Sequence, residues 1–195
     1  MKSILFLILM MGQGTFLTAQ KTVRKISVPK LKGDLNCFYK RKYSPIQRTY
    51  FYPFNIKGSI ELVSFRYHKR NCPVEPGALL TDSLIERKVL SLTEIDSLTD
   101  ILYNNFYKQR PNYLSLTQCF SPRNAILFYD KAGRLKENIL LCFHCSRHEE
   151  SSDKVNFGSD CIQKLEKIRQ FFISVGVHFG TDIENNFYAG EDVYE

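Results

Sequence analysis

Six cysteines constrain the fold of this chain more than any other sequence feature, because each disulfide fixes two separate segments against each other. In a chain of 195 residues they are Cys37, Cys72, Cys119, Cys142, Cys145 and Cys161. Disulfides persist in oxidising compartments and are rare in the cytosol. The meaning of the six cysteines therefore depends on whether the chain is exported.

The N-terminus has the pattern of a secretory signal peptide. Lys2 precedes an apolar run over Ile4–Met11, and the stretch ends at Leu17–Ala19 with residues that suit signal-peptidase cleavage. We expect residues 1–19 to be removed after Ala19. The run is much shorter than the roughly 20 apolar residues of a membrane helix. The sequence thus predicts a periplasmic or secreted protein with no membrane span in its mature form.

Charge divides the remaining chain into three parts. Residues 21–48 carry nine Lys or Arg against a single acidic residue, Asp34, whereas residues 181–195 carry five acidic residues and no basic one. We expect a basic N-terminal arm over 20–48, a single α+β domain over 49–180 and an acidic C-terminal tail over 181–195. The length and the 44% hydrophobic content allow one sizeable core without metals or disulfides.

Hydrophobic patterning predicts four strands. Residues 59–67 and 86–92 are rich in β-formers, and 124–129 form a short apolar run. A turn with Gly133 separates that run from the strand over 135–143, which completes a hairpin.

Two helices are predicted by apolar residues at helical spacing. The first begins at the N-cap Thr93 and ends near Tyr107, and the second begins at Asp160, with Gln163 in the capping-box position, and ends at Gly176. Because no repeated alternation of strand and helix occurs, the expected fold class is α+β, with an antiparallel sheet and two helices packed on one face.

The cysteines allow several pairings. Cys37 and Cys72 both lie in irregular segments that flank a predicted strand, and we expect them to form one disulfide, which would contribute about 3 to 4 kcal/mol. The other group is Cys119, Cys142, Cys145 and Cys161. The preferred interpretation is that one or both of Cys142 and Cys145 are joined to Cys119 or Cys161 in structural disulfides.

Metal and redox chemistry are the alternatives for this second group. Cys142 and Cys145 have the spacing of two thiolate ligands of zinc, and Cys119, Cys161 or His148 would complete the site, but a second Cys-x-x-Cys is missing. Redox catalysis would require Cys142 at a helix N-terminus, whereas it ends a predicted strand. We therefore expect no cofactor, with zinc as the alternative. No motif specifies a reaction, and a non-enzymatic role is favoured.

A segment of alternating aromatic and basic residues is the best candidate for a binding surface. Lys40, Arg41, Lys42 and Tyr43 combine cations with a ring, as required for stacking on a ligand while neutralising its negative charge. The alternative is that the aromatic side chains pack on a sheet and the cations only line its edge. Export makes intracellular nucleic acid an unexpected target, and an envelope protein or anionic envelope polymer the expected partner.

The motif Cys-x-x-Pro-Arg-Asn-Ala-Ile, followed by Phe-Tyr-Asp and Cys-Phe-x-Cys, starts at Cys119 and extends to Cys145. With the helix that follows, it resembles a group of small exported proteins of unknown function from Bacteroidota-type bacteria, over about residues 93–177. This resemblance implies a bacterial envelope setting and a spatial cluster of Cys119, Cys142, Cys145 and Cys161. It implies no catalytic residue.

The sequence favours an exported, disulfide-stabilised binding or structural domain of unknown ligand. The alternative is a thiol–disulfide redox or zinc-binding protein that uses Cys119, Cys142, Cys145 and Cys161.

Overall fold

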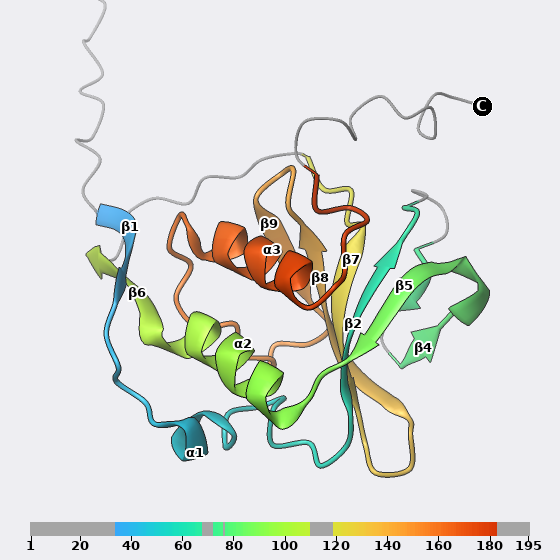
Figure 1. Ribbon diagram of the computed structural model, residues 1–195, viewed down its shortest axis with the longest axis horizontal. Helices are drawn as coiled ribbons and strands as arrows, with labels where there is room; N and C mark the ends of the chain where they lie inside the picture. Colours follow the sequence, from blue (N-terminus) through green and yellow to red (C-terminus); the bar gives the residue numbers. More distant parts are fainter. Residues whose placement is uncertain (1–33, 68–71, 76, 110–118, 183–195) are drawn as a thin grey trace, which may run out of the picture. The chain divides into compact units, whose positions relative to one another are not determined.

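A computed structural model describes residues 34–67, 72–75, 77–109 and 119–182 (Figure 1). The predicted signal peptide lies outside the described residues, and so does the predicted acidic tail from residue 183 onward. The predicted basic arm is described from Asp34.

The central element is a five-stranded sheet in the order β5-β2-β7-β8-β9, and all neighbouring strands are antiparallel. Its strands are β2 (Ile60–Phe65), β5 (Leu84–Val89), β7 (Asn124–Tyr129), β8 (Leu135–Cys142) and β9 (Arg147–Glu150). Two small sheets accompany it. One pairs β1 (Asp34–Tyr39) with β6 (Asn105–Gln109), and the other pairs β3 (Val74–Glu75) with β4 (Ala78–Leu79).

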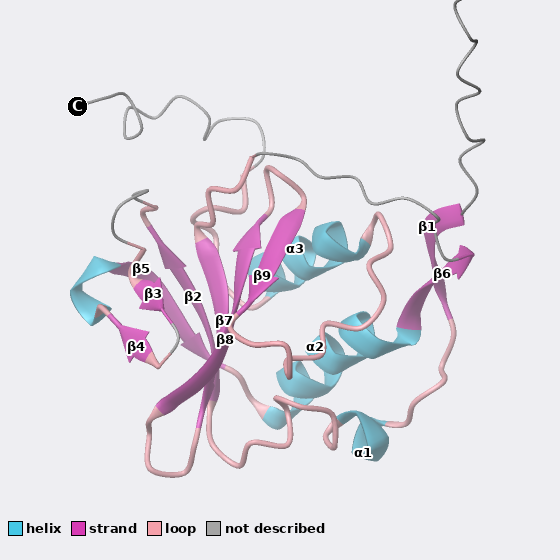
Figure 2. Cartoon of the chain, turned by 180° about the vertical axis from the view of Figure 1, so that it is seen from behind, coloured by secondary structure: helices cyan, strands magenta, loops and turns pink. Residues whose placement is uncertain are grey.

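Helices cover one face of the five-stranded sheet. Figures 1 and 2 show α2 (Leu92–Asn104) and α3 (Lys164–Ser174) side by side on that face, and the β3–β4 hairpin beside the other. A short helix, α1 (Pro45–Arg48), follows β1, and a 3-10 turn (Thr81–Ser83) precedes β5. The predicted α+β class, with an antiparallel sheet and two helices packed on one face, is confirmed.

Alternation along the strands separates two cores, because successive strand residues point to opposite faces. On the side that we call the helix face, Leu62, Ile126 and Ile139 pack with residues of α2 and α3. On the opposite side, which we call the hairpin face, Val63 and Leu127 pack with residues of β3 and β4. Strand β7 is buried on both faces, which explains its continuous apolar sequence.

The helix boundaries differ from the predicted ones. Ser91, not Thr93, is the N-cap of α2, because its hydroxyl accepts from the Glu94 N–H while the Glu94 carboxylate accepts from the Ser91 N–H. The helix ends at Asn104 because the chain continues directly into β6. Helix α3 begins at Lys164 rather than Asp160, and the chain after it turns at Gly176 with a positive φ of 90°, as the sequence predicts.

Candidate functional site

One disulfide joins Cys37 in β1 to Cys161, three residues before α3. The predicted Cys37–Cys72 disulfide is therefore wrong. Pairing of β1 with β6 carries Cys37 to the helix side of the molecule, where its N–H donates to the Gln163 side chain at 2.7 Å. The Ile162 N–H also donates to the Leu35 carbonyl at 2.9 Å. Both contacts bring Cys161 beside Cys37 and remove it from the expected four-cysteine cluster.

Cys72 has a free thiol at the start of the β3–β4 region. Its side chain is partly buried and packs against the hairpin-face core. Burial raises the pKa of this thiol, and the negative charges of Glu75 and Glu149 raise it further. Cys72 is therefore held mainly as the neutral thiol, which is a poor nucleophile.

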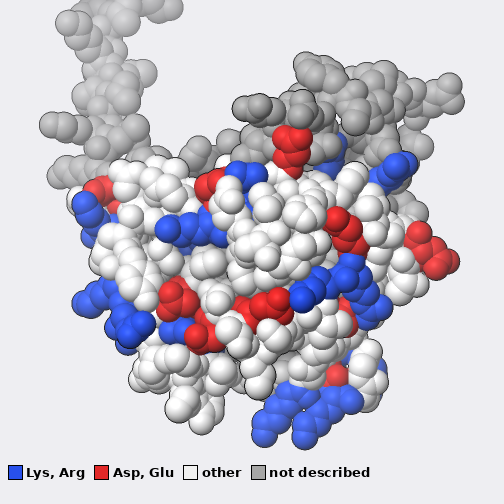
Figure 3. Space-filling model, viewed as in Figure 1, with Lys and Arg blue, Asp and Glu red and all other residues white. Residues whose placement is uncertain are grey.

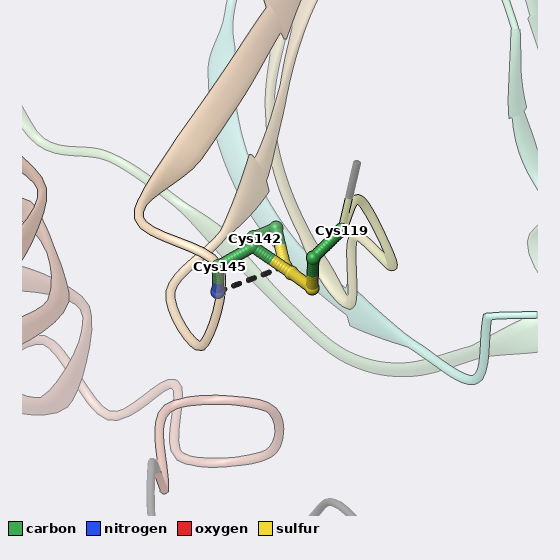
Figure 4. A group of neighbouring side chains, drawn as sticks. All are labelled: Cys119, Cys142 and Cys145. Carbon is green, nitrogen blue, oxygen red and sulfur yellow. Dashed lines mark hydrogen bonds between the residues drawn. A yellow bond between two sulfur atoms is a disulfide. The ribbon is translucent and has the colours of Figure 1, made fainter. Parts of the chain in front are cut away.

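The other three cysteines do come together, at the end of the sheet where β7 begins and β8 ends (Figure 4). Cys119 and Cys145 form a disulfide, and Cys142 is a free, buried thiol. The three sulfur atoms lie within 4.8 Å of one another. The N–H group of Cys145 donates to the Cys142 sulfur at 3.4 Å. We call these three residues the cysteine cluster.

Local backbone structure explains this placement. Cys142 is the last residue of β8, and a tight turn leads through Cys145 to β9. Ser146 closes the turn with a left-handed φ of 49°, and its N–H donates to the Phe143 carbonyl. Arg147 then holds the Cys119 segment, because its guanidinium donates to the Cys119 carbonyl at 3.4 Å and lies 5.1 Å from the Phe120 ring centre.

As a metal site the cysteine cluster offers three sulfur ligands. While Cys119 and Cys145 are joined, only Cys142 can supply a thiolate, so zinc binding requires reduction of that disulfide. Cys161, one of the predicted additional ligands, is bonded to Cys37. His148 instead stacks on Phe157 at 3.6 Å between ring centres and contacts Glu150 at 3.1 Å.

The predicted anion-binding residues lie between β1 and α1. Lys40, Arg41 and Lys42 are exposed, whereas Tyr43 is half-buried against the helix-face core. Asn104 at the end of α2 fixes their backbone, since its side-chain oxygen accepts from the N–H groups of Lys42 and Tyr43 at 3.1 and 2.9 Å. We call residues 40–43 the basic segment. Figure 3 shows its Lys and Arg side chains gathered at the left of the view.

A surface groove of about 740 Å³ separates the basic segment from α2. At its base the guanidinium of Arg48, which is buried, pairs with both Asp96 and Asp100, at 3.0 Å for Asp100. Lys42 and the exposed ring of Tyr39 lie at its rim. The sequence alone did not indicate this groove, because Arg48 and the two carboxylates are about fifty residues apart.

Lys164 is a second charged group that sequence reasoning missed. It is 1% exposed at the start of α3, and its ammonium donates to the carbonyls of Leu102 at 2.7 Å and Phe157 at 3.2 Å. Burial lowers its pKa to about 8. The Leu102 carbonyl belongs to the last turn of α2, so Lys164 satisfies an acceptor that the helix leaves unpaired.

Comparison with protein-family models, with curated proteins and with solved structures found no match. Within the described residues, no helix is both long and apolar enough to cross a membrane.

Proposed function

We propose that this chain is an exported, disulfide-stabilised binding domain, and that the basic segment and its groove bind an anionic envelope polymer. The observation that carries the proposal is a run of three consecutive exposed cations that have no carboxylate partner among the described residues. The Lys42 ammonium does contact aromatic rings, at 4.9 Å from the ring centre of Tyr43 and 5.6 Å from that of Phe106. Among the described residues, Lys40, Arg41 and Lys42 form no ion pair. Adjacent cations that lack a carboxylate partner repel one another, and a bound anion relieves that repulsion.

The backbone holds these cations in a fixed arrangement. Lys40 donates its N–H to the Asn104 carbonyl at 2.9 Å, and the Asn104 amide donates to the Tyr43 carbonyl at 3.0 Å. The Cys37–Cys161 disulfide fixes β1 immediately before the segment. A surface whose backbone is ordered before binding loses little conformational entropy when a ligand arrives.

The distribution of charge in the groove favours a ligand whose negative charges lie at the rim of the groove. Arg48 pairs with both Asp96 and Asp100 at the base and offsets one of their two negative charges. Arg41 and Lys42 supply positive charge at the rim, and Tyr39, which is 54% exposed, supplies a ring face. An acidic polysaccharide combines carboxylates with sugar rings that stack on an aromatic side chain. This is the ligand class that the groove fits best.

An envelope location is part of the proposal. The N-terminal pattern of a signal peptide, the two disulfides and the resemblance to small exported bacterial proteins support it. The disulfides are the structural part of this support, because they favour an oxidising compartment.

The test is retention of the purified protein on an immobilised acidic polysaccharide, polygalacturonate, as the salt concentration rises. The variant Arg41→Glu/Lys42→Glu is expected to lose retention at salt concentrations where the wild type remains bound. Its matched control is Lys131→Glu/Lys136→Glu, which makes the same charge change at exposed positions near the tip of the β7–β8 hairpin. Figure 3 shows basic side chains at this tip as well.

The control variant is expected to remain bound, because its cations lie outside the groove. Equal loss of retention in both variants would mean that only the total charge matters, and would reject the groove as the binding site. Unchanged retention of the Arg41→Glu/Lys42→Glu variant would also reject it, and would direct attention to a protein partner.

A further inference from the structure

We propose that the cysteine cluster is a thiol–disulfide exchange site that transfers a free thiol from buried Cys142 to exposed Cys119, where an external low-molecular-weight disulfide then reacts. This proposal is independent of anion binding. It rests on three sulfur atoms in one place, of which two are already bonded to each other.

The position of Cys142 makes it the attacking thiol. Its sulfur lies within 4.8 Å of both sulfurs of the disulfide, and the hydrogen bond from the Cys145 N–H fixes it beside that residue. Exchange proceeds by attack of a thiolate on a disulfide sulfur, so an adjacent thiol is the first requirement. Figure 4 shows the Cys142 side chain directed toward the disulfide rather than away from it.

The exchange is balanced without an oxidant or reductant. Cys142 releases its proton to solvent, and its thiolate attacks the Cys145 sulfur. A Cys142–Cys145 bond forms while the Cys119–Cys145 bond breaks, and Cys119 leaves as a thiolate. The two bonded cysteines are then three residues apart in one turn, and no electrons have entered or left the protein.

The surroundings favour Cys119 as the leaving sulfur. Cys119 is exposed, whereas Cys142 is 2% exposed and Cys145 is partly buried. The Arg147 guanidinium donates a hydrogen bond to the Cys119 carbonyl at 3.4 Å while it pairs with Glu149 at 3.3 Å, so a cationic side chain holds the segment that carries the departing sulfur. Exchange therefore converts a shielded thiol into one that reagents in solution can reach.

The accessible Cys119 thiolate is the modification site. It attacks one sulfur of an external disulfide, forms a mixed disulfide with that half, and releases the other half as a thiolate. Cys72 lies outside the cysteine cluster, in the hairpin-face core, and burial raises the pKa of its thiol.

The test treats the folded, full-length protein with oxidised glutathione and locates the adduct by mass spectrometry of peptides prepared without reductant. The wild type is expected to acquire glutathione at Cys119 and a Cys142–Cys145 disulfide. Cys142→Ser is expected to acquire none at Cys119, because the Cys119–Cys145 disulfide then has no internal attacker. Cys72→Ser is the matched control and is expected to behave as the wild type.

Three results would overturn the proposal. The first is wild-type protein without an adduct at Cys119. The second is an adduct at Cys119 that forms equally in Cys142→Ser. The third is an adduct only at Cys142 or Cys145, which would mean that a different sulfur is released. Near-ultraviolet circular dichroism of each variant before treatment checks that the fold is intact.

Discussion

The two faces of the five-stranded sheet are covered in different ways. Two long helices cover the helix face, and the Cys37–Cys161 disulfide fixes the chain before α3. A hairpin of two-residue strands covers part of the hairpin face, and Cys72, with its free thiol, packs against that core. Because strand residues alternate between faces, Cys142 lies on the hairpin face, as Leu140 does. The comparison indicates that the helix face is held by a disulfide that closes a long loop, whereas the hairpin face retains free thiols.

The two disulfides test this comparison most strongly. Cys37 and Cys161 are separated by 124 residues, whereas Cys119 and Cys145 are separated by 26. Loop-closure entropy predicts a loss of about 5 kcal/mol for Cys37→Ser/Cys161→Ser and about 3.5 kcal/mol for Cys119→Ser/Cys145→Ser. Urea unfolding monitored by circular dichroism measures both. If Cys119→Ser/Cys145→Ser loses more free energy of unfolding than Cys37→Ser/Cys161→Ser, the disulfide on the helix face is not the more stabilising one.

Matched deletions of aromatic rings compare the two cores directly. Phe172 on the helix face and Phe65 on the hairpin face are both 0% exposed. We expect Phe172→Ala to lower the free energy of unfolding by about 4 kcal/mol and Phe65→Ala by about 3 kcal/mol, since a small hairpin can collapse into a cavity more readily than two helices. Equal losses in urea unfolding would show that both cores are equally rigid.

Lys164 gives the helix face a distinctive pH dependence. Burial lowers the pKa of Lys164 from its ordinary value of 10.5 to about 8 in the folded protein, so the unfolded chain binds more protons between these limits. Stability from this group therefore rises with pH from 8 to 10.5, by at most about 3 kcal/mol, and is constant below that window. Unfolding of Lys164→Met is expected to lack this rise.

The comparison requires unfolding curves at pH 7.5 and 10 in a Cys72→Ser/Cys142→Ser background, which prevents disulfide exchange at high pH. The relevant quantity is the difference between the two proteins, because tyrosines also titrate near pH 10. If the difference in free energy of unfolding between the two proteins is the same at pH 7.5 and pH 10, Lys164 is not the cause of the rise in stability.

Much of the fold could be predicted from local pattern. The strand over 124–129 was predicted with its observed bounds, because an apolar run between two turns leaves little choice. Strand β9 was missed because its sequence, Arg-His-Glu-Glu, is that of a polar loop. It lies at the edge of the sheet, where charged residues prevent pairing with other chains.

The candidate sites depended on contacts that local pattern does not contain. Exposure of Lys40, Arg41 and Lys42 followed from their charge, but Asn104, which fixes their backbone, is about sixty residues away. Three of the four cysteines in the predicted cluster do lie together, whereas Cys161 lies with Cys37. That pairing follows from the β1–β6 sheet, which sequence reasoning did not predict.

The long separation of Cys37 and Cys161 also has a consequence for biosynthesis. During synthesis Cys37 is the first of the six cysteines to emerge from the ribosome, and Cys161 is the last. If oxidation keeps pace with synthesis, Cys37 therefore meets four non-native partners before Cys161 is available. Cys72 is the first of these. We expect maturation to require either delayed oxidation or a disulfide isomerase that removes early Cys37–Cys72 bonds. The pairing that is simplest to infer from the sequence is thus also the error that the nascent chain must avoid.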